Sequence, residues 1–210
     1  MPLDDWSNYA YVSPMSTQTK DTRSHILSVG RSLTARQGYS GVGLNELLKA
    51  AGVPKGSFYH YFASKEAYGC ALLDDFVSQY HASLGETLLD SKLDARARLL
   101  RYFEGWLQKQ TGPNLQDRCL VVKLSAEVAD LSPDMSKILQ RGVTDIITSL
   151  TETIEEGINE GSIAPIKDIQ SVAQSIYHQW LGASLIAGLT QDSTPLDAAL
   201  RSTDIAIPPP

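Results

Sequence analysis

The sequence predicts an all-α protein, and two observations lead to that class. Apolar residues recur at helical spacing along almost the whole chain, whereas strand-like alternation of useful length is absent from the sequence. Glycine and proline pairs interrupt the pattern at a few places, as expected for helices joined by short turns. With 210 residues, of which 42% are hydrophobic, the chain can bury a core without disulfides or metal ions.

Three helices are predicted near the N-terminus. The first covers residues 20–37 and stops at Gly38, the second covers 44–51, and the third follows Pro54, which suits a first helical turn. The tight turn Ala51-Gly52-Val53 joins the second helix to the third. Two short helices that meet at such a turn are typical of a helix-turn-helix, in which the later helix enters the major groove of DNA.

Longer helices are predicted downstream of Ser64, a suitable N-cap for a stripe that runs from Tyr68 to Leu88. Further helical stretches cover residues 99–107, 120–128, 135–158 and 169–189. We divide the chain into a disordered leader, a helix-turn-helix DNA-binding domain, a helical body and a tail, which cover residues 1–15, 16–66, 67–200 and 201–210. Met15 is an alternative start, and the final three prolines predict an extended tail.

The charge distribution points to a nucleic-acid partner although the total does not. The formal net charge is −6, which on average argues against binding to phosphates. Residues 16–66, however, carry seven basic and three acidic side chains, whereas residues 67–210 carry 11 basic and 19 acidic ones. A basic head on an acidic body is typical of a DNA-binding domain attached to another function.

Cysteine usage and hydropathy predict a cytoplasmic protein without membrane association. Cys70 and Cys119 are too few for a disulfide framework and suit a reducing compartment. No apolar run approaches the roughly 18 residues needed to cross a bilayer. Residues 1–15 also lack the basic cluster of a signal peptide.

One motif gives the helix-turn-helix a family resemblance. The segment from Ala50 to Phe62 reads AAGVPKGSFYHYF and is followed by Ser64-Lys65-Glu66-Ala67, which resembles the signature of TetR-family transcriptional repressors. The resemblance implies a homodimer that holds operator double-stranded DNA until a small-molecule inducer binds its helical core. The chain departs from the family at Val42-Gly43, where a threonine usually touches phosphate, and Asn45 is our candidate to replace that contact.

The candidate DNA contacts lie on and after the predicted third helix. Lys55 can meet a phosphate or a guanine edge, and the small residues beside it let the backbone approach the groove. Phe58 and Phe62 lie four residues apart and are assigned to the core, whereas Tyr59 and His60 fall off that face. The predicted DNA-binding residues are Asn45, Lys55, Gly56, Ser57, Tyr59, His60, Tyr61 and Lys65.

Dimerisation is predicted from two apolar stripes in the body. One runs from Val143 to Ile158 and the other from Val172 to Trp180, followed by the small residues 182–184. In the resembled family the last two long helices pair with their copies in a four-helix interface. The alternative is a monomer in which both stripes pack internally.

The segment from Asp117 to Glu127 is the candidate sensor. We expect Asp117 to cap a helix with Cys119 in its first turn, where Arg118 and Lys123 would lower the pKa of the thiol. The segment also resembles that of the NemR-type subgroup, which responds to electrophiles and oxidants through this cysteine. The predicted sensor residues are Cys119, Arg118, Lys123 and Trp180. A structural Cys119 with a non-covalent inducer, such as a small unsaturated carboxylate, stays open.

Other function classes find little support in the sequence. Cys119 with His81 or His178 is the only conceivable nucleophile pair, and spacing supplies no third group to complete it. Metal-ligand spacing is absent from the sequence as well. We therefore predict no enzyme, no cofactor and no metal site. The rival of another class is a helical protein-interaction module without a DNA function.

Overall fold

The computed structural model describes residues 15–114 and 118–210, with side chains from residue 22 onward. These ranges contain helices and no strand, so the all-α class is confirmed. The helices are α1 (Met15–Gln37), α2 (Leu44–Ala51), α3 (Lys55–Tyr61), α4 (Lys65–Leu88), α5 (Ala95–Thr111), α6 (Leu120–Leu131), α7 (Pro133–Glu160), α8 (Ile169–Thr190) and α9 (Thr194–Ala206). Within them, none is long and apolar enough to span a membrane.

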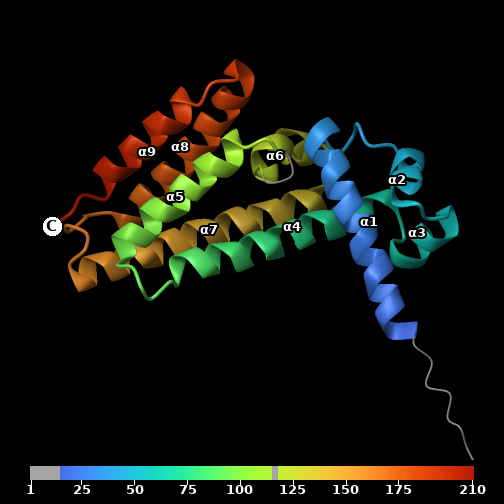
Figure 1. Ribbon diagram of the computed structural model, residues 1–210, viewed down its shortest axis with the longest axis horizontal. Helices are drawn as coiled ribbons and strands as arrows, with labels where there is room; N and C mark the ends of the chain where they lie inside the picture. The colour runs from blue at the N-terminus through green and yellow to red at the C-terminus, as the bar shows by residue number, and fades with distance from the viewer. Residues whose placement is uncertain (1–14, 115–117) are drawn as a thin grey trace, which may run out of the picture.

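The helices form a small head and an elongated body. Figure 1 shows α1, α2 and α3 gathered at one end, while the long helices α4 and α7 run side by side away from them. Helices α5, α8 and α9 pack together over the far half of α4 and α7, and α6 lies next to α1. Because α4 begins directly after α3 and continues into the body, any movement of its first turns moves the head.

An aromatic cluster holds the head together. Phe58 of α3 is fully buried, and its ring centroid lies 5.2 Å from that of Phe62 and 5.5 Å from that of Tyr68. The assignment of Phe58 and Phe62 to the core is therefore confirmed. The turn between α2 and α3 closes on Gly52, whose φ of 64° lies in the left-handed region that favours glycine.

A second aromatic cluster fills the body between α5, α8 and α9. The rings of Phe103 and Trp180 stack at 4.9 Å, and Trp106 packs against Trp180 at 5.8 Å. Both indole N–H groups are satisfied inside the core: Trp106 donates to Ser184 at 3.0 Å and Trp180 donates to Thr203 at 2.9 Å. These hydrogen bonds fix the register of α5 and α9 against α8.

The structure corrects the predicted extended tail. Helix α9 continues to Ala206, and Ile207 is fully buried. The reason is a buried face of α9, formed by Leu196, Ala199 and Thr203, which the final prolines follow instead of interrupting. Pro208 then accepts a hydrogen bond from the amide of Ala164 at 2.9 Å, which ties down the chain after the helix. Residues 1–14 of the predicted leader lie outside the described ranges, and its last residue, Met15, is already helical.

The two stripes expected at a dimer interface also pack inside the protomer. Leu150 and Ile154 of α7 are each 1% exposed, and Ile176 and Trp180 of α8 are 4% and 0% exposed. Helix α7 is covered in this way because α4, α5, α6 and α8 all contact it. The apolar side chains left exposed on α8 are instead Leu185, Ile186 and Leu189.

A glycine in α1 gives a stability test of the head. A Cβ at Gly30 would lie 1.6 Å from the hydroxyl oxygen of Tyr68, a buried ring with no room to shift. We predict that Gly30→Ala lowers the free energy of unfolding by about 1–3 kcal/mol, as overpacking typically does. Urea denaturation measures the loss, and adding Tyr68→Phe should restore part of it because the clashing oxygen is removed.

The matched control is Gly105→Ala in the middle of α5, where a Cβ meets no atom within 4 Å. This change should leave stability unchanged or raise it by up to about 1 kcal/mol. Equal losses for Gly30→Ala and Gly105→Ala would contradict the predicted close packing of α1 on Tyr68.

Candidate functional site

The third helix presents the predicted DNA contacts to solvent. Helix α3 begins after Pro54, which provides no side-chain cap, and its residues Lys55, Gly56, Tyr59 and His60 are all exposed. Tyr59 is 45% exposed although its ring packs edge-on against Phe58 at 5.4 Å. The hydroxyl therefore projects outward from a ring that the core holds in place.

The remaining predicted contacts lie on α3 itself or on the helices beside it. Ser57, Tyr61 and Lys65 are half-buried, and Asn45 is exposed in the first turn of α2. The ammonium of Lys65 lies 5.1 Å from the ring centroid of Tyr39, which orients it at the start of α4. Val42 is 3% exposed and so faces the core, where it cannot contact phosphate. Asn45 therefore stays our candidate for that contact.

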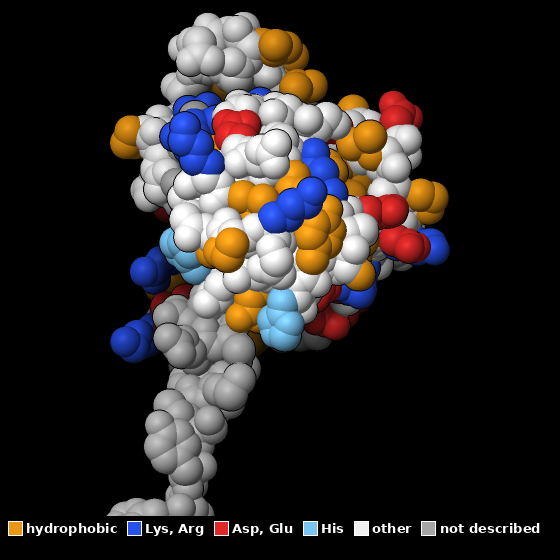
Figure 2. Space-filling model, turned by 90° about the vertical axis from the view of Figure 1, so that its right-hand side faces the viewer, with side chains coloured by type: hydrophobic (Ala, Val, Ile, Leu, Met, Phe, Trp, Pro, Cys, Tyr) orange, Lys and Arg blue, Asp and Glu red, His pale blue; other side chains and the backbone are white. Residues whose placement is uncertain are grey.

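Figure 2 shows the head end of the molecule, where lysine, arginine and histidine side chains lie between apolar patches and only part of the rim is acidic. An α-helix that stands clear of its neighbours with a lysine and a histidine on its exposed side fits the width of the major groove. The geometry of α2 and α3 thus supplies what a helix-turn-helix needs to reach base edges.

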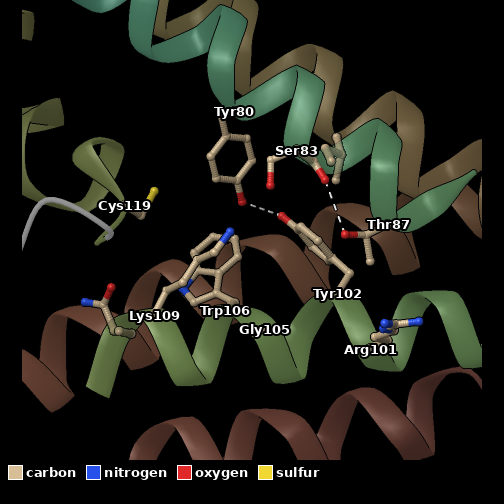
Figure 3. A pocket seen from close by; sticks show the side chains of 11 residues that line it. Tyr80, Ser83, Thr87, Arg101, Tyr102, Gly105, Trp106, Lys109 and Cys119 are labelled. Atoms are coloured by element: carbon tan, nitrogen blue, oxygen red, sulfur yellow. Dashed lines mark hydrogen bonds between the residues drawn. The ribbon is translucent and has the colours of Figure 1, made fainter. Parts of the chain in front are cut away.

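A small polar cavity lies inside the body between α4, α5 and the start of α6. It has a volume of about 60 Å³ and is lined by Tyr80, Ser83, Leu84, Thr87, Arg101, Tyr102, Gly105, Trp106, Lys109, Gln110 and Cys119. In Figure 3, Cys119 and Arg101 lie at opposite ends, and the hydroxyls of Tyr80 and Tyr102 meet between them at 2.6 Å. Burial raises the pKa of both tyrosines, so both hydroxyls are neutral hydrogen-bonding groups.

A larger cavity adjoins it on the other side of Cys119. Its volume is about 390 Å³, and its walls come from the end of α1, the start of α6 and the end of α8. Arg36, Arg118 and Lys123 line it together with apolar residues of α6 and α8, and none of the described lining residues is acidic. This basic lining contrasts with the acidic composition of the body and favours a ligand that carries negative charge or an electron-rich oxygen.

Cys119 is shared by both cavities and behaves differently from the expectation. It is the residue before α6, not a member of its first turn, and it is 9% exposed. Burial raises the pKa of the thiol, although hydrogen bonds from the backbone of Val122 and Val121 oppose that shift. The predicted lowering of the thiol pKa is therefore wrong, because desolvation outweighs the helix N-terminus. The predicted Asp117 cap lies outside the described residues.

The structure separates the four predicted sensor residues. Arg118 and Lys123 line the larger cavity beside Cys119. Trp180 lines neither cavity, because it is fully buried in the aromatic cluster and its N–H already has a partner in Thr203. Its ring packs against Phe103 and Trp106 of α5 and does not face a ligand.

Sequence reasoning missed the polar residues on α4 and α5. Tyr80 belongs to the apolar stripe from Tyr68 to Leu88, and Tyr102 lies in the predicted helical stretch 99–107, so periodicity did not single out either side chain. Gln110 lines both cavities, is 9% exposed, and leaves its side-chain oxygen without a hydrogen-bond partner. A buried, unpartnered amide is costly unless a ligand or water satisfies it, which marks this wall as a binding surface.

The residues considered for catalysis do not assemble. His81 lies 3.4 Å from Asp145 of α7 and lines neither cavity that contains Cys119. His178 is exposed on α8. Within the described ranges, no cluster of three or more histidine, cysteine or acidic side chains could hold a metal ion.

Comparison with known proteins identifies the family. Residues 26–67 match the family described as "Bacterial regulatory proteins, tetR family", and residues 95–203 match "Tetracyclin repressor-like, C-terminal domain". The HTH-type transcriptional repressor NemR of Escherichia coli (strain K12) is 42% identical over 180 residues, which cover 86% of this chain and 90% of that protein. The chain belongs to the TetR family.

Further relatives agree with this assignment. The HTH-type transcriptional repressor DhaR of Mycobacterium sp. (strain GP1) is 32% identical over 85% of this chain and 88% of its own. The crystal structure of the reduced form of E. coli NemR superimposes with a TM-score of 0.86 and covers 90% of this chain and 98% of its own. The chain is thus a DNA-binding helix-turn-helix repressor, and its relatives are transcriptional regulators, not enzymes, as the sequence predicted.

The lysines of the head give a direct test of the DNA surface. We predict that Lys55→Gln and Lys65→Gln each weaken operator binding and reduce the slope of log K against log salt by about one, because each removes a phosphate contact. Fluorescence anisotropy with an operator fragment at several salt concentrations measures both quantities.

Lys92→Gln is the matched control, because Lys92 is exposed in the turn between α4 and α5, far from the head. Its salt slope should equal that of the parent protein. Parent-like slopes for Lys55→Gln and Lys65→Gln would show that these side chains do not meet phosphates.

Proposed function

We propose that this repressor is released from its operator when a small electrophile or oxidant modifies Cys119. The observation that supports this most is the position of the thiol, which forms a wall common to two cavities at the first residue before α6. An adduct on its sulfur has to occupy one of these cavities and so has to push on α5 or α6. Modification of this buried thiol therefore displaces a helix, because the tightly packed wall has no free space for the adduct.

The neutral state of the thiol shapes its selectivity. Because burial raises the pKa of Cys119, the thiolate is a small fraction at neutral pH, and reaction with bulk solvent oxidants is slow. A Michael acceptor that enters the cavity would form a bond from sulfur to its β-carbon while the C=C π bond breaks. The thiol proton ends on the α-carbon, and a donor such as the Tyr102 hydroxyl can bind the carbonyl oxygen during the step.

A reversible inducer is the second candidate, and the lining of the larger cavity favours it. Arg36, Arg118 and Lys123 face this space, and among the described residues the Nε of the Arg118 guanidinium is buried without a hydrogen-bond partner. A small carboxylate could satisfy these donors without a covalent bond. In that case Cys119 would serve only as part of the wall.

The proposed active form is a cytoplasmic homodimer. Two recognition helices must lie about 34–36 Å apart to read one face of a duplex, and a single chain offers one. The exposed apolar residues Leu185, Ile186 and Leu189 on α8 supply a face for the partner, and Gly182 on the same helix leaves open space for close approach.

The chemical trigger is tested by replacing the thiol. In a chain that also carries Cys70→Ser, labelling with N-ethylmaleimide should weaken operator affinity at least about tenfold, equivalent to 1.4 kcal/mol. The Cys119→Ser variant treated in the same way should keep its affinity, because no nucleophile remains in the wall. Anisotropy titrations before and after labelling measure the change.

Equal release of both proteins by N-ethylmaleimide would exclude the thiol trigger and favour the reversible inducer. Mass spectrometry of the labelled chains serves as the control that a single adduct forms on Cys119.

The dimer face is tested on a residue that lines neither cavity. We predict that Ile186→Glu yields a monomer in sedimentation experiments and weakens operator binding at least about a hundredfold, because a buried unpaired carboxylate is costly and the second half-site contact is lost. The control Leu89→Glu changes an equally apolar residue, 78% exposed at the end of α4, and should remain dimeric. A dimeric Ile186→Glu variant would place the interface elsewhere.

A further inference from the structure

The α1–α2 turn of the head is held by a side chain of the body. Glu127 lies on α6, and its carboxylate accepts a hydrogen bond from the amide of Tyr39 at 3.1 Å and a second one from the amide of Ser40. Gly38 makes room for this arrangement, because a Cβ there would lie 3.0 Å from the carboxylate. One carboxylate thus binds two successive backbone amides of the DNA-binding head.

This carboxylate is held in its charged form. Partial burial on its own raises the pKa of Glu127, but the hydrogen bonds from Ser40 and Tyr39 and the nearby Lys123 together lower it below the ordinary value. A charged acceptor makes stronger hydrogen bonds to amides than a neutral one does. The contact therefore remains intact throughout the neutral pH range.

Cys119, Lys123 and Glu127 follow one side of α6 at intervals of four residues, so they share a face of the helix. The eight steps along the chain from Cys119 to Glu127 correspond to roughly 12 Å along the helix axis. Cys119 and Lys123 line the larger cavity, and Ala35 and Arg36 at the end of α1 line its opposite side. The same helix face therefore begins at the cavity and ends at the head.

A second group of contacts fixes the other end of α6 to α4. Ser132, between α6 and α7, donates to the carboxylate of Glu66 in the first turn of α4 at 2.6 Å and also caps α7 by accepting from the amide of Met135. Tyr39 in turn donates its hydroxyl to the carbonyl of Lys65 at 2.6 Å. The α1–α2 turn, α4 and α6 are thus connected around Tyr39, shortly before α2 begins.

We propose that Glu127 is the positioning residue that couples the sensor cavity to the DNA-binding head. Its carboxylate holds the α1–α2 turn at a fixed place along α6, so a displacement of α6 at Cys119 moves the turn and with it α2 and α3. Without this contact α6 no longer holds the α1–α2 turn, and a displacement of α6 at Cys119 moves the head less. The proposal rests on the proposed release of DNA through Cys119, and it adds the residue by which that release reaches DNA.

The test compares Glu127→Ala with Asp130→Ala, a change of an exposed acid on the same helix. In a Cys70→Ser background, each protein is titrated with operator before and after labelling of Cys119 with N-ethylmaleimide. The parent and Asp130→Ala should show the same ratio of dissociation constants, labelled over unlabelled. For Glu127→Ala this ratio should fall toward one, whereas unlabelled affinity should drop about tenfold or less.

Two further measurements separate coupling from folding. Circular dichroism and sedimentation should show an intact dimeric Glu127→Ala, and Glu127→Gln, which keeps one acceptor oxygen, should give an intermediate ratio. A parent-like ratio for Glu127→Ala would overturn the proposal, even if unlabelled affinity falls, because a merely structural residue would lower affinity without changing the response.

Failure of the chemical trigger is recognised independently. If labelling releases neither the parent nor any variant from the operator, the proposed role of Cys119 is wrong. The titrations of unlabelled protein then decide whether Glu127 positions the head. A loss of affinity in Glu127→Ala and not in Asp130→Ala would retain the contact as the one that positions the head. Equal affinities of these two variants would overturn it.

Discussion

The hydrogen bonds between the Glu127 carboxylate and the amides of Tyr39 and Ser40 are the contact on which the function of this fold depends. A head of three helices cannot by itself report what happens in a body built around α4 and α7. The carboxylate gives the head a fixed attachment to α6, and α6 begins at the residue that faces both cavities. Binding to DNA and occupation of the body are thereby linked through one helix.

The chemistry of the cavities fits that arrangement. A thiol whose pKa is raised by burial reacts slowly, so selectivity among electrophiles comes from which molecules can enter the cavities beside it. Tyr80 and Tyr102 offer neutral hydroxyls on one side of Cys119, and Arg118 and Lys123 offer positive charge on the other. A ligand that combines an electron-rich oxygen with a small reactive carbon satisfies both sides at once.

Much of the fold could be predicted from the sequence because helical periodicity, glycine stops and the Phe58–Phe62 pair are local signals. The Cys119 pKa could not, since the sequence shows the helix start and neighbouring cations but not the burial that outweighs them. Nor does the stripe from Val172 to Trp180 reveal whether it packs inside the protomer or against a second copy, because an apolar face does not say which helix covers it. Tyr80 and Glu127 matter through hydrogen-bond partners 22 and 88 residues away, and Gln110 matters through the cavities that it lines. No local pattern in the sequence reveals such neighbours.

Hydrogen exchange of the α1–α2 turn tests the central claim most directly. Exchange at the amides of Tyr39 and Ser40 should be slow in the unmodified dimer and should accelerate when Cys119 is alkylated, because displacement of α6 withdraws the carboxylate that protects them. Acceleration confined to residues 119–123, with the turn still protected in a protein that has released its operator, would contradict a signal that travels through Glu127.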